Sequence, residues 1–393
     1  MIQAGVGLSQ NVSSAESAAM EAAEEAKLHL DGKAPSIVFA FSSIRYDQET
    51  VLRTLHRVFP HVPIVGGSAA GEITSWNTIY NAVNVMAIAT DQISFSTGIG
   101  EHVSKDSFNA AKQAAESLQK TSGKRPDLVI TLFDGMTGNG ADLVEGVKSV
   151  FGDTIPLIGG STGDDYLFEK TYEYYTDAVL SDVAICIGLY GNFSYGFGIR
   201  HGWEAVGLPM KVTKADGALL QEVDGKPALH IYESYFGKDA TELIKEPLAR
   251  IAYTYPLGIA VEDSDELLIR DPVKANEKGE ITMAAAIPVG STIRLMIGDR
   301  DRAITAAKQA AETAKLQLEG HPARAIIMFN CMARNKLLGV RCHEENEFVN
   351  AIIGKDIPMI GFYTYGEQGP LLGKKGTPAY FHNETMTLLV LGE

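Results

Sequence analysis

A short phrase led by proline recurs along this chain of 393 residues. Pro-Ile-Val-Gly-Gly-Ser at 63–68 returns as Pro-Leu-Ile-Gly-Gly-Ser at 156–161 and as Pro-Met-Ile-Gly-Phe-Tyr at 358–363. A weaker relative, Pro-Leu-Gly-Ile, lies at 256–259. The first two copies are about 90 residues apart. Spacing of this kind indicates a fold built from similar units, each contributing an equivalent loop.

A helical phrase recurs with it. Ala-Ala-Lys-Gln-Ala-Ala-Glu occurs at both 110–116 and 306–312, and 18–24 is a close relative. Alanines at i, i+1, i+4 and i+5 give a helix with a narrow, smooth face that can lie close against a sheet. Each helix is preceded by a short segment that ends in glycine, and these segments lie at 4–7, 97–100 and 295–298.

The remaining patterns complete a unit of the form β-α-β-α-β-loop-β. Apolar, β-branched runs predict strands after each alanine-rich helix, at 36–41, 127–133 and 324–329. A second helix is clearest at 48–58, and a closing strand is expected at 82–89, 182–188 and 385–391. The sequence therefore predicts a layered α/β architecture with mixed sheets, built from pseudo-repeats of about 100 residues in two packed halves.

The stretch at 196–288 departs from this pattern because it has no alanine-rich helix. Asp224-Gly225 between apolar runs predicts a hairpin turn, and a helix is expected at about 228–245. We interpret the stretch as a fourth, degenerate copy. Two domains follow, with two regular repeats at 1–195 and one degenerate and one regular repeat at 196–393. We also expect the N-terminal strand at 2–7 to pair within the C-terminal half, or otherwise to complete a pseudo-symmetric closure of the repeats.

Composition narrows the functional classes. The net charge of −15 argues against nucleic-acid binding, which depends on a basic surface. Three cysteines without regular spacing indicate neither a disulfide framework nor a zinc site and favour a reducing compartment. There is no secretory signal pattern and no apolar run of about 20 residues that could span a bilayer. We therefore expect a cytoplasmic protein with no metal site, and we assign no catalytic residue.

The glycine-rich loops at Ser68 and Ser161 resemble anion-cradling loops, although they match no nucleotide-binding motif. A tight turn after a strand explains them equally well. Gly159 to Gly163 also fits the nucleophile-elbow pattern, but no helix follows the serine, so a glycine-rich turn is the preferred interpretation.

Other candidates follow the predicted strands, where ligands collect in open α/β sheets. Asp134 and Cys331 stand at equivalent places in two units. Cys331 near Arg334 is either an activated thiolate or, as we favour, a packing residue. In the third proline phrase Tyr363, Tyr365 and Glu367 replace the glycine-serine loop. Arg334 and Glu367 would then clamp the two ends of an amino acid, or form a structural ion pair with each other.

These motifs resemble the FIST family of bacterial and archaeal sensory proteins over nearly the full chain. The motifs that carry the resemblance to its N-terminal and C-terminal domains are 63–72, 134–135, 156–164, 201–203, 212–215, 224–228, Tyr232, 236–237, Cys331, Arg334, 361–367 and 381–385.

The resemblance implies an intracellular sensory protein that binds a small molecule such as an amino acid, with Ser68, Asp134, Ser161, Cys331, Arg334, Tyr363, Tyr365 and Glu367 as candidate ligand-binding residues. Since 393 directly follows the last strand, we expect output to act in trans on a histidine kinase or another signalling protein. Haem-based sensing of nitric oxide is the alternative, because some relatives bind haem. An enzyme using Cys331 or Asp134 is a further one.

Overall fold

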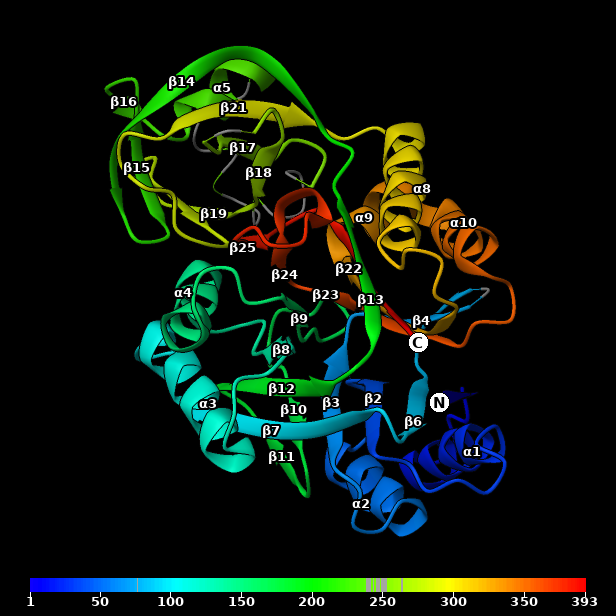
Figure 1. Ribbon diagram of the computed structural model, residues 1–393. Helices are drawn as coiled ribbons and strands as arrows, with labels where there is room; N and C mark the ends of the chain where they lie inside the picture. Colours follow the sequence, from blue (N-terminus) through cyan, green and yellow to red (C-terminus); the bar gives the residue numbers. More distant parts are fainter. Residues whose placement is uncertain (76, 238–241, 243, 245–247, 249–252, 263) are drawn as a thin grey trace.

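Three stretches of the chain fold into the same order of strands and helices (Figure 1). The computed structural model describes residues 1–75, 77–237, 242, 244, 248, 253–262 and 264–393. The first unit comprises β1 (Ile2–Ser9), α1 (Ala15–Leu28), β2 (Ile37–Ser43), α2 (Gln48–Val58), β3 (Ile64–Ala69), β4 (Glu72–Thr74), β5 (Thr78–Ile79) and β6 (Val83–Thr90). The second comprises β7 (Ile93–Glu101), α3 (Ser107–Ser122), β8 (Leu128–Phe133), α4 (Gly140–Phe151), β9 (Leu157–Ser161), β10 (Glu173–Tyr175), β11 (Ala178–Leu180) and β12 (Val183–Gly191).

The third unit has the same order but is interrupted after its first strand. It comprises β13 (Ser194–Arg200), α8 (Arg300–Leu316), β22 (Ala323–Cys331), α9 (Met332–Leu338), α10 (His343–Ile353), β23 (Met359–Thr364), β24 (Glu367–Pro370), β25 (Ala379–His382) and β26 (Met386–Gly392). The predicted mixed α/β fold is confirmed, and the helix predicted at 48–58 is α2.

Each unit forms a six-stranded mixed sheet, and the three sheets have equivalent strand orders. The orders are β1-β6-β2-β3-β10-β11, β7-β12-β8-β9-β24-β25 and β13-β26-β22-β23-β4-β5. Each contains one parallel pair, made by β2 and β3, by β8 and β9, or by β22 and β23.

The last two strands of every sheet come from a different unit. The hairpin of the first unit extends the third sheet, that of the second extends the first sheet, and that of the third extends the second sheet. This exchange carries strands across the division at 195/196 in both directions. The strand pairing therefore links three units and does not confirm an arrangement in two halves. The domain boundary at 195/196 stays a prediction.

The three sheets share one hydrophobic core, which contains buried side chains from all of them. At its centre the ring of Phe362 stacks on Phe41 with 4.1 Å between centroids, and Phe329 meets Phe362 edge-on. The helices of each unit cover the other face of its sheet through separate clusters. Burial on both faces explains why the central strands are apolar throughout rather than alternating.

The alanine-rich helices lie directly on glycine-bearing strands, as expected. A Cβ atom at Gly7, Gly100 or Gly198 would overlap the backbone carbonyl of the facing helix. The third such strand, however, is β13 and not the segment at 295–298. In the third unit, the strand on which helix α8 packs therefore lies about 100 residues before that helix in the sequence.

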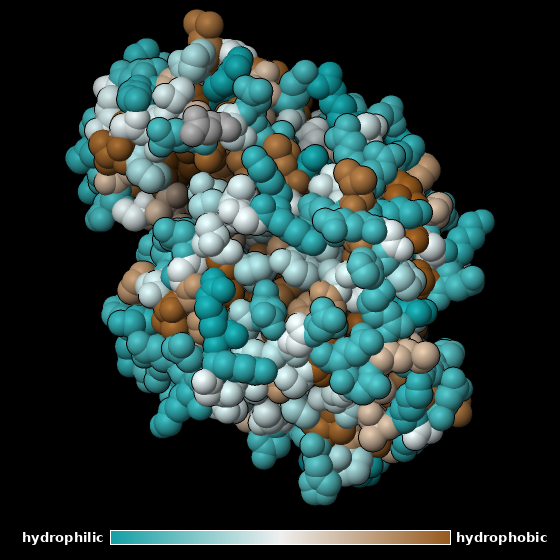
Figure 2. All heavy atoms as spheres, in the orientation of Figure 1, coloured by the Kyte–Doolittle hydropathy of each residue, from teal (hydrophilic) through white to brown (hydrophobic). Residues whose placement is uncertain are grey.

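The intervening stretch forms a separate lobe, which is at the upper left in Figure 1. It contains β14 (Glu204–Asp216), β15 (Leu219–Val223), β16 (Lys226–Pro227), α5 (His230–Phe236), β17 (Leu257–Ala260), β18 (Leu267–Arg270), β19 (Pro272–Ala275), β20 (Ile281–Met283) and β21 (Thr292–Ile297). These strands make an eight-stranded sheet around a core of its own. Figure 2 shows the lobe set off from the body by a notch.

The lobe is an insertion, so its interpretation as a fourth repeat is wrong. All its described strand pairs are antiparallel, whereas every regular unit contains a parallel pair. The predicted turn at Asp224-Gly225 is confirmed, because it joins β15 to β16 with both residues at positive φ. Of the helix expected at 228–245, α5 is described, and most of the remainder falls outside the described residues.

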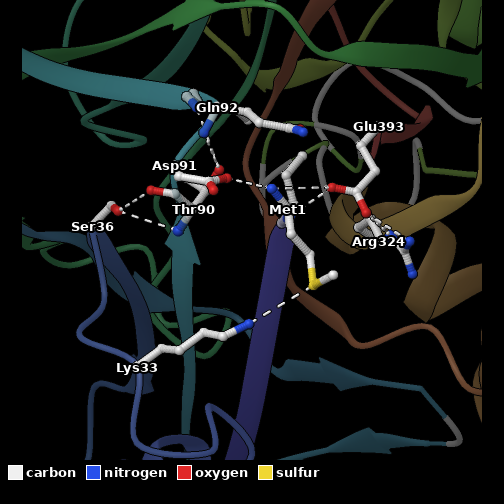
Figure 3. Close-up of polar contacts among 10 residues, drawn as sticks. Met1, Lys33, Ser36, Thr90, Asp91, Gln92, Arg324 and Glu393 are labelled. Atoms are coloured by element: carbon white, nitrogen blue, oxygen red, sulfur yellow. Dashed lines mark hydrogen bonds and ion pairs between the residues drawn. The ribbon is translucent and has the colours of Figure 1, made fainter.

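The two ends of the chain lie side by side (Figure 3). The Glu393 carboxylate accepts a hydrogen bond from the Ile2 N–H at 2.8 Å and another from Arg324 Nε at 2.8 Å. The expectation that β1 pairs in the C-terminal half is wrong, because β1 pairs with β6 of its own unit. β1 is connected to the third sheet through the bond between the Ile2 N–H and the Glu393 side chain and through the shared core.

The glycine contact gives a first test. Replacing Gly198 with alanine should lower the free energy of unfolding by more than about 3 kcal/mol, since the new methyl group meets the backbone of Ala310 rather than a movable side chain. Urea unfolding measures this. Gly320→Ala is the control, because its methyl group would meet nothing within 4 Å and costs only about 1–2 kcal/mol of backbone strain. Equal losses in both variants would contradict the close strand–helix contact.

Candidate functional site

A cavity of about 260 Å³ lies where the lobe meets the second and third units. Its walls come from the carboxyl ends of the parallel strands and from the lobe. The lining includes the loop at 134–140 after β8, the turn at 271–273 between β18 and β19, and residues 331–333 after β22. Ligands collect at this edge of α/β sheets. The insertion therefore covers part of one of the junctions at which binding is expected.

Asp134 shapes the loop after β8. Its Oδ1 accepts hydrogen bonds from Met136 N at 2.8 Å, Thr137 N at 3.1 Å and Thr171 Oγ1 at 3.0 Å, and its Oδ2 accepts one from Asp182 N at 2.7 Å. With four donors already bound, this carboxylate is suited to holding the loop rather than to accepting a substrate proton. Asp134 lines the cavity, but its side chain fixes the position of the loop.

Asp164 holds the loop after β9 in the same way. Its carboxylate accepts hydrogen bonds from the N–H groups of 168–170, at 3.0, 2.6 and 3.0 Å, and from the Tyr365 hydroxyl. Tyr166 and Phe168 consequently adopt positive φ angles of 67° and 58°. Bulky residues rarely take this conformation, and such strain concentrates at functional sites. In this strained conformation the loop places two aromatic rings, those of Tyr166 and Phe168, in the cavity wall.

Aromatic rings form much of the wall. Phe168 stacks on Tyr365 with 5.0 Å between centroids and meets Tyr166 at 4.7 Å. Tyr253 of the lobe and Phe381 of β25 complete the aromatic lining. Among the described residues that line the cavity, none is lysine, arginine or histidine. The cavity can hold a flat or apolar group, and its own side chains offer no positive charge.

One end of the cavity is acidic. Cys331, Asp271 and the adjacent Glu384 present a thiol and two carboxyl groups, whose ligand atoms all lie within 4.8 Å of one another. Burial raises the pKa of Asp271 to about 6, and burial followed by the charge of Asp271 raises the pKa of Glu384 well above its usual range. Burial and the neighbouring carboxylates also raise the pKa of the Cys331 thiol. An activated thiolate beside an arginine is therefore not what the site provides.

The lobe is fastened on both sides of the cavity. Arg270 is buried and donates a hydrogen bond from Nη1 to the Phe381 carbonyl at 2.7 Å. On the opposite side Ala286 N donates to Asn139 Oδ1 at 3.2 Å, at the N-terminus of α4. These contacts hold the lobe against the second and third units beside the cavity.

The predicted site residues divide into two groups. Asp134, Ser161, Cys331 and Tyr365 line the cavity. The other four are buried outside its lining. Among these, Ser68 Oγ accepts a hydrogen bond from Tyr172 N at 2.9 Å, and the Tyr363 hydroxyl bonds Thr78 Oγ1 at 3.1 Å.

Arg334 does not pair with Glu367, which corrects both the proposed ligand clamp and the proposed ion pair. Its guanidinium forms a fully buried ion pair with Glu345 of α10, in which Nε donates to Oε1 at 3.0 Å. It also donates to the carbonyls of His201, Ala303 and Glu384. Arg334 thus joins β13, α8 and α10, and none of its donors is left for a ligand carboxylate.

Glu367 occupies a position that all three units share. Glu72, Glu173 and Glu367 are the first residues of the exchanged hairpins, and in strand register they face Phe362, Gly67 and Gly160. All three are fully buried, and burial is the first cause that raises each carboxyl pKa. Glu367 accepts hydrogen bonds from Thr385 N and Oγ1. Its recurrence at every junction indicates a role in joining the units.

The cavity does not fit a haem. Its volume is below the range of about 300–1,000 Å³ typical of pockets for drug-sized ligands. No basic side chain in the described lining could pair with the propionates, and no histidine is there to bind the iron. The buried His201 and His382 already contact Glu266 and the Gly369 carbonyl.

Residues 36–226 match the model of the FIST N domain, and residues 228–370 match that of the FIST C domain. The chain belongs to the FIST family. FIST domains are sensory domains of signal transduction, which gives the chain a role in signalling.

The similarity to curated relatives extends over most of the chain. An uncharacterized protein of Mycobacterium tuberculosis strain H37Rv is 27% identical over 94% of this chain and 95% of its own length. One from Methanocaldococcus jannaschii is 26% identical over 72% of this chain and 58% of its own length. A cyanuric acid hydrolase from A. caulinodans superposes with a TM-score of 0.32 at 9% identity, over 100% of this chain and 99% of its own. So remote a likeness carries no functional inference. In the described part of the FIST protein, no helix has the length and hydrophobicity to cross a membrane.

Sequence reasoning missed several residues of the cavity. Tyr166 and Phe168 follow the second glycine-serine loop, and their aromatic character was the available signal. Glu384 lies within a motif that supports the family resemblance. No sequence pattern pointed to Asp271, because it belongs to the insertion and reaches the site only through the docking of the lobe.

The buried ion pair gives a test. Arg334→Met should lower the free energy of unfolding by about 3–5 kcal/mol, because it leaves the Glu345 carboxylate buried without its partner. Urea unfolding measures this loss. The double variant Arg334→Met/Glu345→Met should recover part of it. A fully stable Arg334→Met protein that had lost ligand affinity would show that Arg334 binds ligand after all.

Proposed function

We propose that this FIST-family protein senses a small metabolite bound in the cavity between the lobe and the second and third units. The supporting observation is the cavity itself, which combines strained aromatic loops with an acidic end at the carboxyl ends of the strands. Aromatic and apolar walls with a few fixed polar groups are typical of sites for small organic ligands.

The ligand class is an amino acid or a related metabolite. The volume of about 260 Å³ restricts the ligand to a small molecule. Tyr166, Phe168 and Tyr365 offer ring faces and edges to an apolar side chain, and an amine would be attracted by the acidic end and by the π faces. A carboxylate would need a positive partner that the described lining lacks.

Binding would be reported through the lobe. It contacts the core on both sides of the cavity through Arg270 and Ala286, so a ligand held between lobe and core favours one of their relative positions. A signalling protein that recognises this position would receive the signal, with a histidine kinase as the partner class.

Ligand screening tests the proposal. In thermal-shift screening of amino acids and related amines, at least one compound should raise the melting temperature, because it binds the folded state alone. Phe168→Ala should weaken binding of that compound by about tenfold in calorimetric titration, since it removes a ring that stacks in the wall.

The neighbouring Leu167 provides the matched control, because it is exposed and lies outside the cavity lining. Leu167→Ala should bind as the unchanged protein does. Equal affinities for Phe168→Ala and the unchanged protein would place the ligand elsewhere.

A further inference from the structure

Glu384 is a buried carboxyl group whose side chain lies within hydrogen-bonding reach of another carboxyl group, that of Asp271. The side chain is 0% exposed, and neither Oε1 nor Oε2 receives a hydrogen bond from an N–H or O–H donor of the described residues. Asp271 Oδ1 is in the same situation. Buried polar atoms are bonded in the great majority of cases, and an exception calls for a proton, a water or an ion.

Three potential metal ligands converge at this point from different parts of the fold. Cys331 is the last residue of β22, and Glu384 lies two residues before the start of β26. Asp271 lies between β18 and β19 of the lobe. Their ligand atoms lie within 4.8 Å of one another. Two atoms bonded tetrahedrally to one zinc ion, at about 2.3 Å for sulfur and about 2.0–2.2 Å for oxygen, lie about 3.3–3.7 Å apart. An inward movement of the ligand atoms by up to about 1.5 Å would therefore complete a site.

The nearby arginines do not neutralise the cluster by hydrogen bonding. Arg270 donates to the carbonyls of Ile269, Ala286 and Phe381. Arg334 contacts only the backbone carbonyl of Glu384, because its ion pair is with Glu345. The two carboxyl groups and the thiol thus face one another, an arrangement favourable only when protons or a cation lie between them.

We propose that Cys331, Asp271 and Glu384 form a site for Zn²⁺ at the end of the cavity. A thiolate favours zinc over magnesium or calcium, and the two carboxylates are acceptable additional ligands. On binding, the Cys331 thiol and any protonated carboxyl release their protons to solvent, and the three side chains bond the ion through sulfur and oxygen. Three protein ligands leave a fourth position open, and Asp271 and Cys331 border the cavity there.

The ion would also supply the missing positive charge. This second step rests on the proposed function: the carboxylate or amine of the metabolite would occupy the open position, in place of the arginine that the sequence suggested. Because Asp271 belongs to the lobe and the other ligands to the core, the same ion would fasten the lobe over the cavity.

Metal titration without any metabolite tests the site. Protein freed of metal with a chelator should bind one Zn²⁺ per chain in equilibrium dialysis. Cys331→Ser and Glu384→Gln should each weaken this by at least about tenfold, since even changes behind the ligands cost about 10–100-fold. Cys186→Ser is the control, as this cysteine is equally buried but belongs to another cluster.

Cobalt provides a readout that does not depend on a ligand variant being folded. Co²⁺ added to the Cys186→Ser/Cys342→Ser protein, in which Cys331 is the sole cysteine, should produce a thiolate-to-cobalt absorption band that Zn²⁺ displaces. Absence of stoichiometric Zn²⁺ binding, or of this band, would overturn the proposal in favour of a proton shared by the carboxyl groups. Metal binding without any metabolite hit would leave the site standing and count only against the proposed function.

Discussion

The central core shared by three sheets is the constraint on which the rest of the structure depends. Each sheet buries one face there and the other under its own helices, and each is completed by a hairpin from another unit. No unit could satisfy its strand edges or bury its apolar surface alone. The exchange also brings the carboxyl ends of the parallel strands in each sheet beside a hairpin from a neighbouring unit, so every junction between units is a concentration of loops.

These junctions are equivalent in backbone but differ in chemistry. Ser43, Asp134 and Cys331 occupy the same place after the first parallel strand of their units. Ser43 bonds Asp165, Asp134 holds a loop, and Cys331 faces two carboxyl groups. The lobe, inserted between β13 and α8, covers the junction of the second and third units. One insertion has thus added a wall to one of several similar loop clusters, where a partly open cavity lies.

The sequence predicted those features that local patterns determine. Apolar runs identified the strands, the alanine phrases identified the helices that touch glycine, and the placement of Asp134 and Cys331 at strand ends followed from the repeat. The sequence did not predict the features that depend on contacts between residues far apart in the chain. Two apparently adjacent segments, 295–298 and 300–316, belong to different bodies, and the partner of Arg334 is on another helix. Asp271 and Glu384 meet only because the lobe docks, and no spacing in the chain records that contact.

The central claim is that ligand binding occurs at the one junction covered by the lobe. Hydrogen–deuterium exchange, measured with and without the metabolite that raises the melting temperature, tests it most directly. Exchange should slow together at 134–140 and 164–168 of the second unit and at 271–273 of the lobe, because these segments surround the same cavity. The loop at 29–36 of the first unit, between α1 and β2, has no residue in the lining and should be unchanged. Protection confined to the first unit, or absent from the lobe, would contradict the account.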